Sequence, residues 1–313
     1  MNDKYYLSVC LNPVLQKTII LPKFTENEIN RSKEYYFDAS GKGINCSRVL
    51  TQLREKVIHL THAGGLNKRL FLKKAKKDKI KIFWINSKSE IRYCYTIINK
   101  KDKTITEIIE EAEQVDKNTE QLIYKKYLKL LPLCHTVIIS GTKAAGFYDN
   151  LYPEMVNIAK KEKKIVILDI KGNDLVNSLK YRPDVIKPNF YEFFTTFFPW
   201  KTIINQKHDT SIIEDVKSKM LEINREYKTK VILTRGKNNT FYTFENSIKI
   251  IKPEKIIPVN TTGCGDAFTS GFASIFSKNR DFEESIIKGL ECAKINALSI
   301  KPGNIIIKDE IKS

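Results

Sequence analysis

The feature that most constrains the fold is the regular alternation of short apolar runs with longer stretches of helical periodicity. The apolar runs have the length of buried strands and lie at 5–10, 57–61, 136–140, 165–169, 185–187 and 231–234. The stretches with helical periodicity lie at 43–53, 67–79, 118–130, 149–162, 189–197, 211–227, 264–277 and 282–300. This alternation predicts an α/β fold with a doubly wound, mostly parallel sheet and helices on both faces.

Residues 16–37 and 92–108 depart from this alternation, because they contain strand patterns with no helical stretch between them. The patterns lie at 17–21, 34–37, 93–99 and 104–108. Strands outside the main alternation predict a small additional sheet that forms a lid over one edge of the main sheet. Neither an internal repeat nor a low-complexity linker occurs, so we expect a single domain, 1–313, with the lid strands inserted.

The chain is strongly basic, with 54 Lys and Arg residues against 36 Asp and Glu residues and a formal charge of +18. The lysines are nevertheless spread over the whole chain and often stand beside acidic residues, as in 160–164. Because no Lys/Arg stripe with interleaved aromatic residues occurs, we expect no nucleic-acid partner. A basic chain does suit a negatively charged small substrate such as a phosphorylated metabolite.

The cysteines and the apolar segments bear on the compartment. Six cysteines are widely spaced and form neither a Cys-x-x-Cys motif nor a Cys/His pair at zinc-ligand spacing. The first residues lack the apolar core of a signal peptide, and no apolar run reaches the ~20 residues that span a bilayer. We therefore expect reduced thiols, no membrane contact and a cytoplasmic location.

A glycine-rich turn at 260–271 leads into one of the last helical stretches and has the sequence Asn-Thr-Thr-Gly-Cys-Gly-Asp-Ala-Phe-Thr-Ser-Gly. Gly263 and Gly265 allow a tight turn and a close approach of the backbone to a ligand. The unsatisfied N–H groups at the start of a helix bind phosphate or developing negative charge. Asp266, in the first turn, is either a helix cap or a base placed beside an anion-binding site. The segment is neither a Walker A loop nor the Rossmann fingerprint, since Phe268 stands where the latter needs glycine.

A second glycine-rich segment, at 39–48, also leads into a helical stretch and has the sequence Ala-Ser-Gly-Lys-Gly-Ile-Asn-Cys-Ser-Arg. Gly41 lets the backbone approach a ligand, Lys42 adds a positive charge, and Asn45 can hydrogen-bond a polyol hydroxyl. A turn followed by a helix start explains the same residues without any ligand.

The two glycine segments together resemble the PfkB family of carbohydrate kinases. Residues 40–45 are similar to its Gly-Gly-Lys-Gly-x-Asn signature, and residues 260–266 to its Asp-Thr-x-Gly-Ala-Gly-Asp signature. The resemblance extends over nearly the whole chain, through Asn-Pro at 12–13, Asn-Arg at 30–31, Arg92, Lys-Pro-Asn-x-x-Glu at 187–192 and Thr-Arg-Gly at 234–236. Within this family, the sequence is most similar to the phosphosugar branch, which includes 1-phosphofructokinase and tagatose-6-phosphate kinase. The resemblance implies a ribokinase-like fold and the use of ATP and Mg²⁺.

The resemblance also implies a role for each residue of the site. Asp266 would accept the proton of the attacking hydroxyl. The backbone N–H groups that face the transferred phosphoryl group would come from Gly263, Cys264 and Gly265. Mg²⁺ would be organised through water by Asn189 and Glu192. The nucleotide would be bordered by Lys187, Asn189, Glu192, Thr234, Gly236 and Asn296. The sugar would be held by Gln16, Gly41, Lys42 and Asn45, and its phosphate by Arg31 and Arg92.

The resemblance is weaker at the sugar end of the expected site. Gln16 stands where the family has an Asp that accepts hydrogen bonds from sugar hydroxyls, and Cys264 replaces the Ala of the second signature. The expected reaction is transfer of the γ-phosphate of ATP to a ketose phosphate, first of all fructose 1-phosphate to fructose 1,6-bisphosphate. Tagatose 6-phosphate, an unphosphorylated sugar or nucleoside, and a non-catalytic sugar-phosphate-binding role stay open. A homodimer through the lid is a further expectation.

Overall fold

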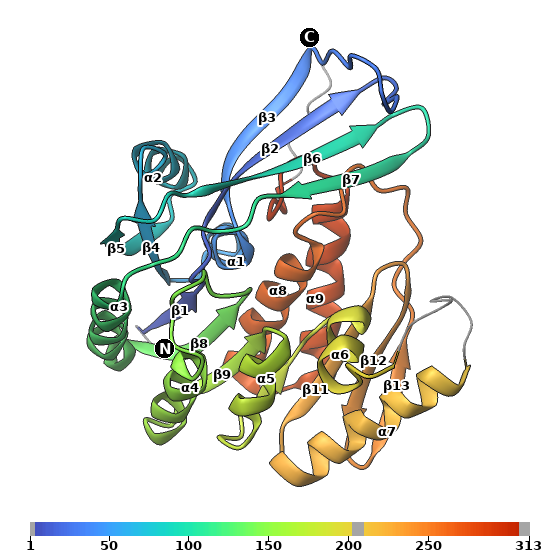
Figure 1. Cartoon of the computed structure of the whole chain (residues 1–313). Coiled ribbons are helices and arrows are strands. Elements are labelled where there is room, and N and C mark those ends of the chain that lie inside the picture. Colours follow the sequence, from blue (N-terminus) through green and yellow to red (C-terminus); the bar gives the residue numbers. More distant parts are fainter. Residues whose placement is uncertain (1–3, 202–209, 307–313) are drawn as a thin grey trace.

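The computed structural model, which describes residues 4–201 and 210–306, is built on a nine-stranded sheet (Figure 1). Its strands are β1 (Tyr5–Val9), β4 (Val57–Gly64), β5 (Lys81–Ser87), β8 (Cys134–Ser140), β9 (Ile165–Asp169), β10 (Val185–Ile186), β11 (Lys230–Arg235), β12 (Asn238–Phe244) and β13 (Ser247–Ile251). From β5 they pair in parallel in the order β5-β4-β1-β8-β9-β10-β11, and β12 and β13 extend the sheet as an antiparallel hairpin. The predicted doubly wound, mostly parallel sheet is confirmed.

Helices cover both faces of this sheet, because successive strand residues point to opposite sides. The helices are α1 (Lys42–Gln52), α2 (Lys68–Lys77), α3 (Lys117–Leu130), α4 (Leu151–Lys161), α5 (Gly172–Leu179), α6 (Phe190–Phe197), α7 (Thr210–Tyr227), α8 (Cys264–Asn279) and α9 (Phe282–Ala297). On β8, Val137 and Ile139 belong to a core formed with α3 to α7. Ile138, between them, belongs to a second core formed with α8 and α9. The strand is therefore buried from both sides, as its uninterrupted apolar sequence indicated.

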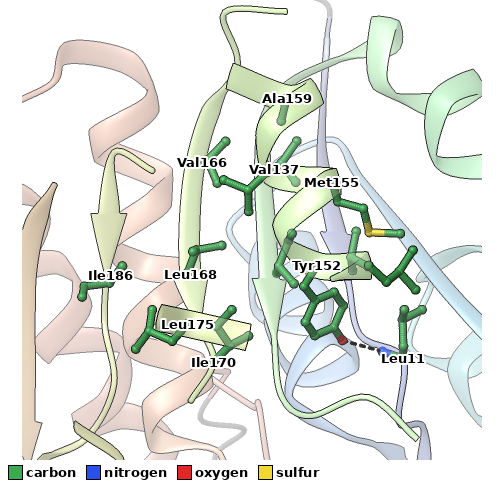
Figure 2. Close-up of a cluster of buried hydrophobic side chains, with 14 of the residues drawn as sticks. Leu11, Val137, Tyr152, Met155, Ala159, Val166, Leu168, Ile170, Leu175 and Ile186 are labelled. Carbon is green, nitrogen blue, oxygen red and sulfur yellow. Dashed lines mark hydrogen bonds between the residues drawn. The ribbon is translucent and has the colours of Figure 1, made fainter. Parts of the chain in front are cut away.

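Figure 2 shows the packing of α4 against β8 and β9, where Met155 and Ala159 face Val137 and Val166. Each fully buried side chain of this kind contributes about 1.5–3 kcal/mol relative to an exposed one. The hydroxyl of Tyr152 in the same helix accepts a hydrogen bond of 3.1 Å from the backbone N–H of Leu11. This bond holds the segment that follows β1, which leads directly into the small sheet.

The small sheet has four strands in the order β3-β2-β6-β7. They are β2 (Val14–Leu21), β3 (Glu34–Ser40), β6 (Arg92–Asn99) and β7 (Thr104–Ile109). β2 starts five residues after β1 ends, and β3 leads into α1 through Gly41 alone, whose φ of +101° favours glycine. Figure 1 shows this sheet extending over the start of α8. The lid strands expected at 16–37 and 92–108 thus lie on one separate sheet.

Three strands and one α-helix of the described residues went unpredicted: β5, β12, β13 and α5. β5 is an edge strand whose residues are mostly exposed or half-buried, so it lacks an apolar run. α5 has only 8 residues, and the β12–β13 hairpin begins with the polar sequence Asn-Asn-Thr. Each is stabilised by its neighbours rather than by its own sequence pattern. Among the described residues, no helix combines the length and the apolar character needed to cross a membrane.

Candidate active site

A cleft of about 1670 Å³ lies at the carboxyl ends of the parallel strands, between the large sheet and the lid. A site for one small molecule typically occupies about 300–1,000 Å³, so this cleft has room for two ligands side by side. Fourteen of the predicted site residues line it: Gln16, Gly41, Lys42, Asn45, Arg92, Lys187, Asn189, Glu192, Thr234, Gly236, Gly263, Cys264, Gly265 and Asp266. Parallel strands bring these distant segments together, because their carboxyl ends share one edge of the sheet.

The glycine turn forms the start of α8 in the middle of the cleft. Gly263 is the residue before the helix and has a φ of +83°, in the left-handed region that favours glycine. A Cβ at Gly263 would lie only 2.8 Å from the backbone nitrogen of Gly303, whereas a Cβ at Gly265 would meet nothing closer than the Nζ of Lys187, at 3.6 Å. The first turn of α8 therefore faces the cleft with backbone N–H groups that have no carbonyl partner within the helix, as an anion-binding site requires.

Asp266 does not cap this helix. Its carboxylate is 5% exposed, and Oδ2 accepts a hydrogen bond of 2.8 Å from the Nδ2 of Asn45. Burial is the main cause that raises the pKa of Asp266 from 3.8 to about 7, and the negative charge of Asp169 adds to it. Lys42, the Asn45 amide and Lys187 act in the opposite direction. A carboxylate with a pKa close to neutral is well matched to accept a proton at physiological pH.

Asp169, at the carboxyl end of β9, joins two lysines beneath the glycine turn. The Nζ of Lys42 lies 2.9 Å from Oδ1 of Asp169, and the Nζ of Lys187 lies 3.1 Å from Oδ2. Burial alone would raise the pKa of Asp169, yet the ammonium groups of Lys187 and Lys42 hold it below its ordinary value. Asp169 is not among the predicted site residues. Its position as an acid at the end of a core strand is the signal that could have identified it.

Lys42 forms two ion pairs that its expected sugar-binding role did not include. Besides Asp169, its Nζ contacts Oε1 of Glu192 at 2.9 Å. Burial opposes the charged form of Lys42, but the carboxylates of Asp169 and Glu192 outweigh it and raise the pKa of Lys42. The ammonium group therefore stays positive beside the helix start where an anion would bind.

Asn189 and Glu192 form a capping box at the start of α6. The Asn189 side chain accepts from the N–H of Glu192 at 2.8 Å, and Oε2 of Glu192 accepts from the N–H of Asn189 at 3.0 Å. This leaves Oε1 of Glu192 directed at Lys42, together with Oδ1 of Asp169. The Lys42 ammonium group occupies the space between these two oxygens, so an ion beside them would be held through water. This suits Mg²⁺, which binds few protein oxygens and keeps several waters. Within the described residues, no cluster of three or more His, Cys, Asp or Glu side chains could hold a metal ion by itself.

The lid forms the other wall of the cleft. Gln16 is 5% exposed, and its Nε2 donates to the hydroxyl of Thr96 on β6 at 2.8 Å. Arg92 lines the cleft with a buried Nε that has no hydrogen-bond partner, while its Nη1 donates to the backbone oxygen of Glu110. On β7, Glu107 accepts a hydrogen bond of 2.8 Å from the hydroxyl of Thr262 in the glycine turn. The lid and the anion-binding turn are thus in direct contact.

Two predicted site residues lie elsewhere. Arg31 is exposed in the connection between β2 and β3, outside the residues that line the cleft. Asn296 on α9 is fully buried, with its Nδ2 donating to the backbone oxygen of Thr262 at 3.0 Å and its Oδ1 accepting from the N–H of Gly303 at 2.6 Å. Asn296 therefore braces the glycine turn from behind and has no free group for a nucleotide.

The far end of the cleft combines basic and apolar side chains. Gly236, whose φ is +58°, directly follows β11, and Thr234 lies near the end of that strand. The basic side chains here are Lys237, Lys252, Lys255 and Lys294, and the apolar ones are Ile287, Leu290, Ala293 and Ala297. A row of lysines next to an apolar surface suits a ligand with a polyphosphate and a flat ring.

Known structures share this fold at low sequence identity. A possible 1-phosphofructokinase from Thermotoga maritima is 22% identical, with a TM-score of 0.83 over 95% of this chain and 93% of that one. The phosphofructokinase-2 of Escherichia coli in complex with fructose-6-phosphate is 16% identical, with a TM-score of 0.80 over 94% of each chain. Ribokinase from Thermotoga maritima is 19% identical, with a TM-score of 0.72 over 98% of this chain and 97% of that one. At this identity the likeness concerns the fold, which is ribokinase-like.

A family model extends this result from fold to family. The model of the pfkB family carbohydrate kinases matches residues 11–308, which include both glycine segments and the cleft that they form. The chain therefore belongs to the PfkB family of carbohydrate kinases.

Proposed function

We propose that the protein transfers the γ-phosphate of ATP to a hydroxyl of a ketose phosphate, with fructose 1-phosphate as the first candidate substrate and fructose 1,6-bisphosphate as its product. The observation that carries the proposal is the position of Asp266. Its buried carboxylate, with a pKa of about 7, lies in the first turn of the helix whose glycine-rich start lines the same cleft. A base beside an anion-binding turn is what attack of a hydroxyl on a phosphoryl group needs.

In the proposed reaction the substrate hydroxyl oxygen forms a bond to the γ-phosphorus of ATP, the bond to the β-phosphate oxygen breaks, and ADP leaves. The hydroxyl proton passes to Asp266, whose Oδ2 is already held by Asn45. The N–H groups of the glycine turn, together with Lys42 and Lys187, stabilise the charge on the transferred group. Asp169 and Glu192 would hold Mg²⁺ through water, and the ion would neutralise negative charge between the phosphates.

Arg92 supports a phosphorylated substrate. It lines the cleft, and its buried Nε has no hydrogen-bond acceptor. An anionic oxygen of the substrate could be that acceptor. A guanidinium group binds phosphate with two parallel hydrogen bonds, which a neutral sugar would not use. Arg92 is therefore the residue that we assign to the substrate phosphate.

A second candidate function is phosphorylation of an unphosphorylated sugar. Glu107 and Glu111 line the same wall as Arg92, and Arg31 lies outside the cleft. Acidic side chains accept hydrogen bonds from hydroxyl groups and repel phosphate. These residues favour a neutral polyol at the lid, so both classes of substrate belong in the test.

Two further parts of the proposal concern the protein as a whole. We propose a homodimer that pairs through the lid, since Tyr35 and Ile108 are exposed apolar side chains on its strands. We also propose a reducing compartment such as the cytoplasm. All six cysteines are free thiols among the described residues, which supports it.

The proposal is tested by ADP release from MgATP with a panel of acceptors at equal concentrations. The panel contains fructose 1-phosphate, fructose 6-phosphate, tagatose 6-phosphate, fructose, ribose and adenosine, with Asp266→Asn as the control for contaminating kinases. We expect the highest kcat/KM with a ketose phosphate. Preference for fructose or ribose would select the second candidate, and no ADP release above the Asp266→Asn control with any acceptor would refute both.

A further inference from the structure

Arg48 is a fully buried guanidinium group one helical turn after Asn45 on α1. It is 2% exposed, and each of its three nitrogens donates to acceptors from separate parts of the chain. Nε donates to Oδ2 of Asp78 at 2.9 Å, and Nη2 donates to the backbone oxygen of Ala39 on β3 at 2.5 Å. Nη1 donates both to Oδ1 of Asn45 at 2.9 Å and to the backbone oxygen of Pro302 at 2.6 Å. Burying a charge in this way is costly, and an apolar side chain could fill the same space.

The contact with Asn45 decides which end of that amide faces Asp266. A guanidinium group has only donors, so it fixes the amide oxygen of Asn45 on its own side. The Nδ2 of Asn45 is then left to donate to Oδ2 of Asp266, at 2.8 Å. The hydroxyl of Ser40 also contacts Oδ1 of Asn45, at 3.1 Å, but a hydroxyl can donate or accept and does not select an orientation.

We propose that Arg48 is a positioning residue of the phosphoryl-transfer site, which orients the Asn45 amide so that it holds Asp266 ready to receive the substrate proton. This inference rests on the proposed function of Asp266 as the base. Arg48 itself touches neither the cleft nor any reacting group. The Nδ2 of Asn45 donates to Asp266 and stabilises its ionised form, because a hydrogen bond to a charged acceptor is stronger than one to a neutral acceptor.

The same guanidinium group also fastens the glycine turn. Its acceptor Pro302 precedes Gly303, which has a φ of +69° and lies between the two halves of the site. A Cβ at Gly303 would lie 2.8 Å from the Cα of Asn45, and a Cβ at Gly263 would lie 2.8 Å from the nitrogen of Gly303. The 302–303 segment is therefore wedged between α1 and the anion-binding turn, and Arg48 holds it there.

Other charged or titratable groups surround Arg48 and Asp266, and the Arg48 variants keep all of them. Around Arg48 these are Asp78, Lys301 and Asp38, since the Nζ of Lys301 contacts Asp78 at 2.5 Å and Asp38 at 3.0 Å. Around Asp266 they are Asp169 from β9, Lys42 and Cys46 from α1, Lys187 after β10, Cys10 after β1 and Cys264 on α8. Because Arg48→Lys also keeps the buried positive charge, a change in the titration of Asp266 in that variant reports on the Asn45 amide.

The test compares Arg48→Met and Arg48→Lys with the control Gln52→Ala. Methionine fills a similar volume without donors. Lysine keeps the buried charge, but its single nitrogen lacks the planar fork with which arginine reaches Asp78, Ala39, Asn45 and Pro302 at once. Gln52 lies one turn further along α1 and also ties the end of the chain, through the N–H of Ile305 at 2.7 Å and Asn304 at 3.2 Å, but it has no contact with Asn45. It is thus matched in its structural role.

Two readouts are measured for each protein: the pH dependence of kcat/KM, and the pKa of Asp266 without any sugar. The second comes from the pH dependence of the difference in unfolding free energy between each protein and its Asp266→Asn partner. We expect both Arg48 variants to raise this pKa by roughly one to two units, the effect of losing one hydrogen bond to a charged group. The acid limb of kcat/KM should move with it, and kcat should fall roughly 10-fold or more, since base catalysis contributes about 10²–10⁴-fold. Gln52→Ala should lose stability only.

An unchanged pKa of Asp266 in both Arg48 variants would overturn the proposal, as would an equal change in Gln52→Ala. If Arg48→Met does not fold, Arg48→Lys alone decides between these results, because it keeps the charge that pairs with Asp78. Absence of kinase activity in the unaltered protein would refute the proposed function. A shifted pKa in the sugar-free measurement would still support the positioning role.

Discussion

The buried carboxylate of Asp266 predicts an unusual pair of effects for a single substitution. Asp266→Asn removes the ionisable group but keeps the shape of the side chain and an oxygen that can accept from Asn45. We expect the variant to lose kinase activity by at least about 10²-fold, because its amide cannot take up the hydroxyl proton. We expect the same variant to be more stable than the unaltered protein at neutral and alkaline pH.

The size of the gain follows from the pKa. A carboxylate whose pKa rises from 3.8 to about 7 on folding is disfavoured in its ionised form by about 4 kcal/mol, at about 1.4 kcal/mol per pKa unit. Because the folded pKa is raised, the folded state holds a proton that the unfolded state releases between these two values. The unfolding free energy therefore falls as the pH rises through this window, and the loss is complete above it. The variant should gain about 4 kcal/mol at pH 8 and about 2 kcal/mol near pH 5.5.

Urea unfolding followed by circular dichroism at these two pH values measures the difference directly. The matched control is Asp281→Asn, at the start of α9, where the Asp281 side chain accepts from the N–H of Glu284 at 2.9 Å. Asparagine caps a helix as well as aspartate, so this control should stay within about 0.5 kcal/mol at both pH values. This control distinguishes the general effect of removing a negative charge on stability from the effect of removing a buried one.

Two results would refute this reasoning. A variant that is less stable than the unaltered protein at pH 8, or equally changed at both pH values, would show that burial does not disfavour the ionised form of Asp266. Undiminished turnover in the variant would remove Asp266 from the role of base, whatever its effect on stability.

Three other substitutions test separate parts of the site. Asp169→Asn should lower the unfolding free energy by about 3–5 kcal/mol in urea unfolding at pH 7, opposite to Asp266→Asn, because it leaves two lysines without their buried partner. This loss should shrink as the pH falls through the lowered pKa of Asp169, and a stabilised variant would contradict the assigned ion pairs. Arg92→Ala should raise the KM for a ketose phosphate by roughly 10-fold or more and leave the KM for ATP unchanged, whereas the control Arg31→Ala should change neither. Equal effects of Arg92→Ala on both KM values would place Arg92 outside the substrate site. Gly303→Ala should lower the unfolding free energy by about 2–4 kcal/mol, because the added methyl group causes overpacking in addition to left-handed strain. The control Gly172→Ala, at φ +64° with open space around it, should lower it by about 1–2 kcal/mol from strain alone, and similar losses in both would show that the 302–303 segment is not tightly packed.

Much of the fold could be predicted because its signals are local. Buried parallel strands are short apolar runs, and their helices carry an apolar stripe, so the order of elements from β1 to α9 follows from neighbouring residues. The exceptions are elements with weak local patterns. β5 is an exposed edge strand, and the β12–β13 hairpin begins with a polar sequence, so both depend on the strands beside them.

The candidate site divides in the same way. Gly263 and Asp266 were found because a glycine turn before a helix has a definite geometry wherever it occurs. Asp169 was missed because its partners are distant, with Lys42 lying 127 residues before it. Arg31 matched a motif, yet the connection that carries it leads away from the cleft.

The sequence by itself determined the alternation of strands and helices, the two glycine turns and the carboxylate beside one of them, since backbone conformation and periodicity depend on residues close together in the chain. Only the tertiary structure decided that Asn45 holds Asp266 across 221 residues and that Arg48 contacts Pro302 across 254. The reason is that a pKa of about 7 for Asp266 arises from burial and from charges on other elements, and these surroundings exist only once the sheet order has brought the elements together.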